Sequence, residues 1–239
     1  AAARGIMTTD TFPKAAIRKT RINGKDVVIQ GMAKGSGMVA PDMATMLSFV
    51  ATDAALPASA LQAMLGAGVK TTFNCITVDS DTSTSDMVLL FATGAAGNAP
   101  VADTVDALHD PALADFRAAL NDLLRELALL VIRDGEGATK LMTITVSGAV
   151  SDESAWRVAM AIGNSPLVKT AIAGEDANWG RVVMAVRKCG EPAVRHPLSA
   201  SIGRVCTATD GSLTDCDVDT PVVAIMYGPE CGIAGDHGL

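Results

Sequence analysis

The sequence lacks the cysteine and histidine patterns that mark disulfide frameworks and metal sites. Its five cysteines are odd in number and scattered, and no two of them form a C-x-x-C pair. Its three histidines lie far apart along the chain, without the H-x-x-x-H spacing of a metal-binding helix. These absences argue against a disulfide-rich secreted scaffold and favour the reducing cytoplasm, and we expect no bound metal.

Long apolar runs and an excess of positive charge are also missing. No apolar run approaches the roughly 20 residues that a membrane-spanning helix needs, and the opening AAARGIMTTD lacks the apolar region of a signal peptide. Lysine and arginine number 19 against 26 aspartates and glutamates, and the resulting net charge of −7 repels a phosphate backbone. We therefore expect neither a membrane nor a nucleic acid as a partner.

The chain has the length and apolar content of a folded protein. Its 239 residues suffice for one large domain or two small ones, and hydrophobic residues make up 49% of them. No internal repeat and no low-complexity linker divides the sequence. The first residue is not Met, and the last residues, IAGDHGL, form no polar tail. We expect one layered α/β domain within a segment of a longer protein.

Three segments carry helix signals: residues 57–68, 110–134 and 151–174. In the second, Asp110 is suited to cap the helix and Pro111 to occupy its first position, and apolar residues then recur at helical spacing. The first begins at Pro57 or is capped by Ser59. The third follows Ser151 and has two acidic residues in its first turn, where the helix dipole favours negative charge.

Seven short segments are strand candidates, because each is rich in branched or apolar residues and is bounded by glycine, proline or aspartate. They are residues 45–52, 72–78, 86–93, 140–150, 181–187, 198–209 and 221–227. They alternate irregularly with the expected helices. This pattern predicts an α/β fold in which helices cover sheets.

Hydroxyl groups, glycines and charges gather in five loops. The loops cover residues 6–14, 34–47, 79–86, 132–140 and 173–181. Taken singly, each loop is typical of turns and helix caps, because Ser, Thr, Asp and Gly supply the hydrogen bonds and backbone angles that turns need. A functional interpretation therefore depends on the five loops together.

Together the five loops resemble one enzyme family. The stretches IMTTDTFPKAA, KGSGMVAPDMATML, DTSTSD, DGEGATK and GEDANWGR occur in the order and at the spacing typical of the ornithine acetyltransferases, the bifunctional glutamate N-acetyltransferases of arginine biosynthesis. The resemblance spans essentially the whole chain. It implies a layered α/β sandwich that is similar in logic to the N-terminal nucleophile hydrolases.

In that family the precursor cuts itself at an Ala-Thr bond, which the resemblance places between Ala44 and Thr45. Residues 1–44 would then end the α chain, and residues 45–239 would belong to the β chain. Thr45 would be the catalytic nucleophile and would also contact the substrate. A threonine hydroxyl is a poor nucleophile at neutral pH unless a base lies beside it, and an N-terminal threonine carries its own α-amine.

The resemblance assigns three further substrate-binding residues, Thr8, Lys34 and Glu136. Lys34 can pair with a substrate carboxylate as a point charge. Glu136 suits a substrate ammonium or the departing amine of acetylornithine. The family's oxyanion-hole Thr-Gly pair and its last two substrate contacts fall upstream and downstream of this sequence. The resemblance therefore implies that these residues alone do not catalyse the reaction.

The implied enzyme moves acetyl from N-acetylornithine to Thr45 and then to glutamate, and it releases ornithine and N-acetylglutamate. No cofactor is implied, although acetyl-CoA stays open as a second acetyl donor. The two cleaved chains would pair into an α2β2 assembly in the cytoplasm.

Two other functions stay open at this point. A related self-cleaving aminopeptidase or amidase would give the acyl group to water, but Lys34 and the DGEGATK stretch suit a charged amino-acid acceptor better. The other alternative is a scaffold that keeps the fold without its catalytic ends.

Overall fold

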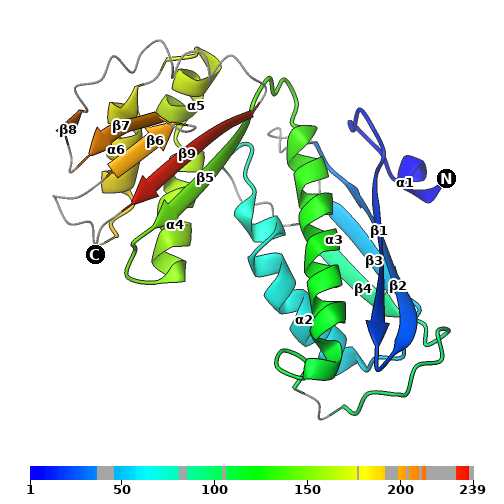
Figure 1. Cartoon of the computed structure of the whole chain (residues 1–239). Helices are drawn as coiled ribbons and strands as arrows, with labels where there is room; N and C mark the ends of the chain where they lie inside the picture. Colours follow the sequence, from blue (N-terminus) through cyan, green and yellow to red (C-terminus); the bar gives the residue numbers. More distant parts are fainter. Residues whose placement is uncertain are drawn as a thin grey trace. The chain divides into compact units, whose positions relative to one another are not determined.

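The computed structural model describes residues 1–36, 46–80, 85–103, 106–176, 178–191, 199–202, 205–209, 212–213 and 230–236. The chain divides into two compact units, Ala1–Glu136 and Gly137–Leu239 (Figure 1). Each unit has its own sheet and its own buried apolar core. The predicted α/β class is therefore confirmed. The expectation of a single domain was wrong, because each sheet buries its apolar residues against helices of its own unit.

The first unit is built on a four-stranded sheet of order β1-β2-β3-β4. Its strands are β1 (Lys14–Ile22), β2 (Lys25–Lys34), β3 (Leu47–Thr52) and β4 (Met87–Ala92). Strand β2 pairs antiparallel with both β1 and β3, whereas β4 runs parallel to β3 (Figure 1). The strands predicted over residues 45–52 and 86–93 are confirmed as β3 and β4.

A tight turn at Asn23 and Gly24 joins β1 to β2, two strands that the sequence analysis did not predict. The φ angles of these residues are 49° and 78°. Positive φ at both central residues is the geometry of a type I′ turn, which asparagine followed by glycine adopts readily. Strand β1 alternates between more buried and more exposed positions, and the charged residues Lys19 and Arg21 occupy exposed ones. This charge content hid the strand from a search for apolar runs.

Two helices, α2 (Ala58–Lys70) and α3 (Ala114–Arg133), cover one face of this sheet (Figure 1). The helices predicted over residues 57–68 and 110–134 are thereby confirmed. Ahead of α3 the chain makes a single 3₁₀ turn, and the Asp110 carboxylate accepts a hydrogen bond from the Ala112 amide over 2.8 Å. Asp110 therefore caps the start of this helical segment, as the sequence predicts.

The core of the first unit lies between α3 and the sheet. Four leucines of α3 are fully buried there: Leu120, Leu123, Leu124 and Leu127. Gly31 on β2 lets this helix come close, since a Cβ atom built on Gly31 would lie 2.8 Å from Cδ1 of Leu127. Close packing of α3 against β2 holds the end of that strand in a defined position.

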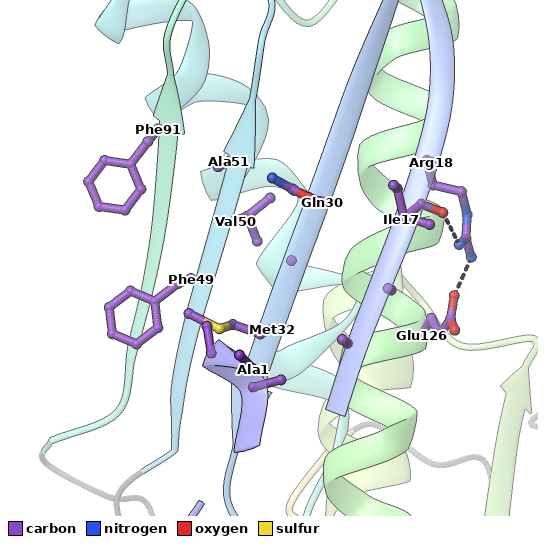
Figure 2. Close-up of a pocket in the computed structure, with 15 residues that line it drawn as sticks. Ala1, Ile17, Arg18, Gln30, Met32, Phe49, Val50, Ala51, Phe91 and Glu126 are labelled. Atoms are coloured by element: carbon purple, nitrogen blue, oxygen red, sulfur yellow. Dashed lines mark hydrogen bonds and ion pairs between the residues drawn. The ribbon is translucent and has the colours of Figure 1, made fainter. Parts of the chain in front are cut away.

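The opposite face of the same sheet carries a hollow of about 610 Å³ (Figure 2). The strand register places Ile17 opposite Gln30 and Met32 opposite Phe49, so these side chains share the face that α3 does not cover. Ile17 is 56% exposed. The short helix α1 (Ala2–Gly5) also contributes to the lining.

The second unit has a five-stranded sheet of order β5-β9-β6-β7-β8. Its strands are β5 (Leu141–Ser147), β6 (Ser199–Ile202), β7 (Val205–Thr209), β8 (Ser212–Leu213) and β9 (Glu230–Asp236). Strands β5 and β9 run parallel, and the remaining pairs are antiparallel. The strand predicted over residues 140–150 is β5, and within the predicted segment 198–209 the described residues 199–202 and 205–209 form β6 and β7.

The described residues of the second unit include the helices α4 (Asp152–Gly163), α5 (Pro166–Ala173) and α6 (Trp179–Lys188). The Ser151 hydroxyl caps α4 by accepting the Ser154 amide over 3.1 Å. The uninterrupted helix predicted over residues 151–174 was wrong, because the chain leaves α4 after Gly163. Ser165 then caps a new helix whose first residue is a proline.

Two of the predicted strands were wrong. Residues 181–187 lie in α6, where Val182, Ala185 and Val186 are buried at the spacing of one helical face. Residues 72–78 contain a 3₁₀ turn, in which Phe73 enters the core of the first unit. In both segments β-branched composition suggested a strand, but tertiary packing decided otherwise. The strand predicted over residues 221–227 lies outside the described residues.

Candidate functional site

The structure brings three of the predicted substrate-binding residues into one region of the first unit. Lys34 is the last residue of β2, Thr8 lies in the segment before β1, and Glu136 follows α3. The Lys34 ammonium donates to the Thr8 hydroxyl over 3.5 Å. The Ser36 hydroxyl lies 3.5 Å from Oε1 of Glu136. Residues from three separate parts of the chain therefore meet beyond the end of β2.

A buried serine, Ser36, links the two charged residues. Its carbonyl accepts the Glu136 amide over 2.8 Å, and its hydroxyl lies 2.7 Å from the Thr9 hydroxyl. Ser36 follows Lys34 by two positions, so these bonds hold the loop after α3 against the end of β2. Ser36 lies in the loop over residues 34–47, but its role could not be predicted from the sequence.

The two charged residues of the site differ in how far they are buried. Lys34 is only 6% exposed, whereas Glu136 and Thr8 are exposed. Among the described residues, no carboxylate lies within 4.0 Å of the Lys34 ammonium. An ammonium that is removed from water without a counter-charge is costly. This position is therefore suited to receive a carboxylate from a ligand.

The residue that directly follows Thr45, Met46, lies beside the same loop. Its amide donates to Oδ1 of Asp86 over 2.9 Å. A Cβ atom built on Gly35 would lie 3.4 Å from the Cα atom of Met46, and Gly35 has a φ of +139°, which favours glycine. The predicted cleavage residues Ala44 and Thr45 themselves lie outside the described residues.

Beneath the site lies a cluster of three buried charges that the sequence analysis did not predict. The Lys14 ammonium contacts Oδ1 of Asp10 and Oδ2 of Asp134, each over 2.5 Å. All three side chains are at most 2% exposed. Asp10 and Lys14 lie in the first of the five loops, but sequence alone does not distinguish a buried lysine from an exposed one at the start of a strand.

The Asp10 carboxylate is stabilised in its charged form. Burial raises the pKa of this carboxyl, but hydrogen bonds from the Lys14 ammonium and from the amides of Gly35 and Thr8 outweigh burial and hold the pKa below its ordinary value. Asp10 is therefore an anion at neutral pH, and both of its carboxylate oxygens accept hydrogen bonds.

This arrangement can bind a small molecule that carries both charges. A carboxylate would pair with Lys34, and an ammonium or a departing amine would face Glu136. The exposed hydroxyl of Thr8 adds a donor or acceptor at the surface of the same region.

Comparison with known proteins gives the family of the chain. A family model described as the ArgJ family matches residues 1–234. The chain belongs to the ArgJ family. The resemblance noted in the five loops is thereby confirmed.

Two curated relatives of this ArgJ-family chain share the name "Arginine biosynthesis bifunctional protein ArgJ". The protein from Gluconobacter oxydans (strain 621H) is 65% identical over 238 residues, which are 100% of this chain and 55% of that protein. The protein from Rhizobium meliloti (strain 1021) is 58% identical over 238 residues, which are 100% of this chain and 57% of that protein. The chain thus spans little more than half the length of these relatives.

A crystal structure of the arginine biosynthesis bifunctional protein ArgJ from Bacillus halodurans has a similar fold. It matches this ArgJ-family chain with a TM-score of 0.75 and 37% sequence identity, and the match covers 83% of this chain and 89% of that one. The fold expected from the family resemblance is therefore supported by a solved structure.

The hollow on the open sheet face is separate from the predicted site residues. Its lining includes the ion pair between Arg18 and Glu126, but not Thr8, Lys34 or Glu136 (Figure 2). The remaining lining is mostly alanine and larger apolar side chains. This composition offers little for acyl transfer, so we place the candidate site of the ArgJ-family chain at the end of β2 instead.

The predicted loop over residues 173–181 lies in the second unit. There the Glu175 carboxylate accepts a hydrogen bond from the Lys140 ammonium over 2.6 Å, and α6 begins at Trp179. The described part of this loop therefore forms a helix start and an ion pair within its own unit.

No group of three or more His, Cys, Asp or Glu side chains is placed to hold a metal ion within the described ranges. In the same residues, no helix combines the length and apolar character needed to cross a membrane.

Proposed function

We propose that the complete polypeptide containing this ArgJ-family chain transfers an acetyl group from N-acetylornithine to glutamate through an acetyl ester on Thr45. The observation that carries the proposal is the nearly buried Lys34 ammonium, which has no carboxylate partner among the described residues. The names of the curated relatives, which place those proteins in arginine biosynthesis with two functions, support it.

The charges of the site match the two amino acids. N-acetylornithine and glutamate each carry an α-carboxylate that can pair with Lys34, and each has an amine or ammonium that can approach Glu136. Because donor and acceptor share these groups, one site can hold them in turn. Met46 packs against Gly35, which directly follows Lys34. Because Met46 is the residue directly after the proposed nucleophile Thr45, the β chain would begin close to this site.

Cleavage would prepare the nucleophile. The Thr45 hydroxyl attacks the Ala44 carbonyl carbon, the peptide C–N bond breaks, and the acyl group moves from nitrogen to oxygen. Water then hydrolyses this ester, which leaves a carboxylate on Ala44 and frees both the hydroxyl and the α-amine of Thr45.

Acetyl transfer would follow in two halves. The Thr45 hydroxyl attacks the acetyl carbonyl of N-acetylornithine, and its proton passes to the α-amine of the same residue and then to the departing amine. The amide C–N bond breaks, ornithine leaves, and the acetyl group remains as an ester. The amine of glutamate then attacks this ester, and N-acetylglutamate forms while the Thr45 hydroxyl is restored.

The test uses the complete, cleaved enzyme with N-acetylornithine as the only substrate. We expect one ornithine per active site and an increase of one acetyl group in the mass of the chain that begins at Thr45. Release of ornithine without this adduct would favour direct transfer, and no ornithine at all would refute the proposal.

The acceptor separates the proposal from its nearest alternative. With glutamate present, the acetylated enzyme should yield N-acetylglutamate and turn over with ping-pong kinetics. If acetate stays the main product at saturating glutamate, the enzyme is a self-cleaving hydrolase. If the complete protein neither cleaves nor binds acetylornithine, it is a scaffold.

Three further features of the proposal can be measured on the same preparation. We propose that the ornithine cycle needs no cofactor, and replacing N-acetylornithine by acetyl-CoA tests whether a second donor is accepted. We also propose that two α and two β chains assemble, which light scattering tests through the particle mass. The scattered cysteines lead us to propose the cytoplasm as the location, and fractionation of cells tests this.

A further inference from the structure

Three charged side chains are buried under the candidate site in a continuous set of ion pairs. The Lys14 ammonium donates to Asp10 and to Asp134, and the exposed fractions of the three side chains are 0%, 0% and 2%. The same ammonium lies 4.8 Å from the centroid of the Phe12 ring. Because taking charges out of water is costly, a buried ion cluster is often no more stable than a well-packed apolar one, although removing one partner leaves an unpaired buried charge. One well-attested benefit of such a cluster is fixed geometry.

The Asp10 carboxylate ties two segments of the site together. Its Oδ2 atom accepts the amide of Thr8 over 3.1 Å, and its Oδ1 atom accepts the amide of Gly35 over 2.8 Å. Gly35 is bonded directly to Lys34. One carboxylate therefore sets where Thr8 and the backbone that carries Lys34 lie relative to each other.

The Asp134 carboxylate holds the other side of the site. It accepts the amide of Thr11 over 3.0 Å, and it also accepts a hydrogen bond from the Thr11 hydroxyl. Asp134 is the residue directly after α3, and Glu136 follows two positions later, where its amide donates to Ser36. The position of Glu136 is therefore tied to the same segment that carries Asp10.

We propose that the Asp10–Lys14–Asp134 cluster is a positioning element that fixes Lys34 and Glu136 at the spacing needed to hold both charged ends of the amino-acid substrate. The inference rests on the proposed function. None of the three residues needs to touch the substrate. Each acts through a backbone hydrogen bond or a short stretch of chain that leads to a binding residue.

The test compares single amide variants of the complete, cleaved enzyme. Asp10→Asn and Asp134→Asn keep the size of the side chain but remove its charge and one of its acceptor oxygens. We expect KM for both N-acetylornithine and glutamate to rise by about 10- to 100-fold, with a smaller change in kcat, because displaced binding groups weaken substrate binding.

The matched control is Arg18→Met. Arg18 pairs with Asp122 and Glu126 over 2.6 Å each, so it also joins β1 to α3, but its partners are partly exposed and none of the three lies among the predicted site residues. Its KM values should stay within about twofold of the wild type, because exposed ion pairs contribute little. Melting temperatures of all variants show which of them are folded at the assay temperature.

The KM values distinguish a positioning role from a purely structural one. A purely structural cluster would lower the concentration of folded enzyme, and so the apparent kcat, without changing the KM of the molecules that remain folded. Unchanged KM in both amide variants, or loss of the fold in both, would overturn the positioning role while leaving the proposed function intact. Absence of acetyl transfer by the wild type would instead refute the proposed function and this inference with it.

Discussion

The backbone amide of Glu136 donates to the carbonyl of Ser36 over 2.8 Å, and this bond joins two residues that lie 100 positions apart in the sequence. Because both atoms belong to the backbone, the bond survives replacement of the Glu136 side chain. The carboxylate of Glu136 is exposed, and it accepts a hydrogen bond from the Ser36 hydroxyl over 3.5 Å. A substitution can therefore remove the charge of Glu136 while the backbone at this position stays where it is.

Glu136→Gln should give a folded, cleaved enzyme with weak substrate binding. Loss of a hydrogen bond to a charged group costs about 1.5–3 kcal/mol, so we expect KM for N-acetylornithine to rise at least about 10-fold. Steady-state kinetics measure this. Glu126→Gln, a half-buried position on α3 outside the candidate site, is the control and should leave KM unchanged. Equal effects of the two variants would argue against a binding role.

Lys34→Met should remove the contact for the substrate carboxylate. Truncating one partner of a desolvated charge pair costs about 2–5 kcal/mol, so kcat/KM for acetyl transfer should fall about 10²-fold or more. The control is Lys25→Met, which changes the exposed first residue of the same strand. Normal kinetics in the folded Lys34→Met enzyme would show that Lys34 does not bind the substrate carboxylate.

Thr45→Ala should leave the complete polypeptide uncut. The proposed attack on the Ala44 carbonyl needs the hydroxyl, so Thr45→Ser, which keeps a hydroxyl, should still be cleaved. Intact-mass measurement of the purified proteins reads the outcome. Cleavage of the alanine variant at the same bond would show that another group is the nucleophile.

Gly68→Ala should destabilise the first unit, because the added Cβ atom would lie 2.7 Å from Cδ1 of Leu124 on α3. Overpacking of this kind costs about 1–3 kcal/mol. Gly66→Ala in the same helix is the matched control, since a Cβ there meets nothing within 4 Å and alanine favours a helix by about 1 kcal/mol. Denaturant titrations should therefore shift in opposite directions, and a shift of the same sign in both would contradict the close approach of α2 and α3.

Asp10 should contribute stability that is lost in acid. Its folded-state pKa lies below the ordinary value of about 3.9, so its contribution is complete above that pH and disappears as the pH falls through the folded-state pKa. The difference in unfolding free energy between wild type and Asp10→Asn should therefore be large at pH 7 and shrink below about pH 4. Asp26→Asn, in an exposed pair with Arg21, should show a small difference that salt abolishes. A pH-independent difference for Asp10→Asn would mean that its charge plays no part.

Local signals in the sequence predicted the strongly patterned elements. Asp110 and the leucines of α3 satisfy the rules for a cap and for a buried helix face at the same time, and the helix was found. The strand β1 was missed because charged residues interrupt its apolar pattern, although Asn23 and Gly24 are a strong hairpin signal. Segment 181–187 was misread because valine favours strands in isolation, while the buried face formed by Val182 and Val186 follows helical spacing.

The candidate site was only partly predictable for a different reason. Lys34 and Glu136 could be named from loop motifs, because those motifs resemble a family. The cluster around Lys14 could not, since it depends on a contact with Asp134, which lies 120 positions further along the chain. Burial of a lysine is a property of the tertiary fold, and no local pattern encodes it.

The pairing of β2 with β3 determines what a cut between Ala44 and Thr45 would do to the folded molecule. These are the two inner strands of the four described in this sheet, and their register runs from Ile29 opposite Thr52 to Lys34 opposite Leu47. The two products would stay joined by this ladder. Once they were separated, however, refolding would need two chains to meet and would become a second-order process. Recovery of the cleaved protein after denaturation should therefore depend on its concentration, whereas recovery of the uncut precursor should follow first-order kinetics.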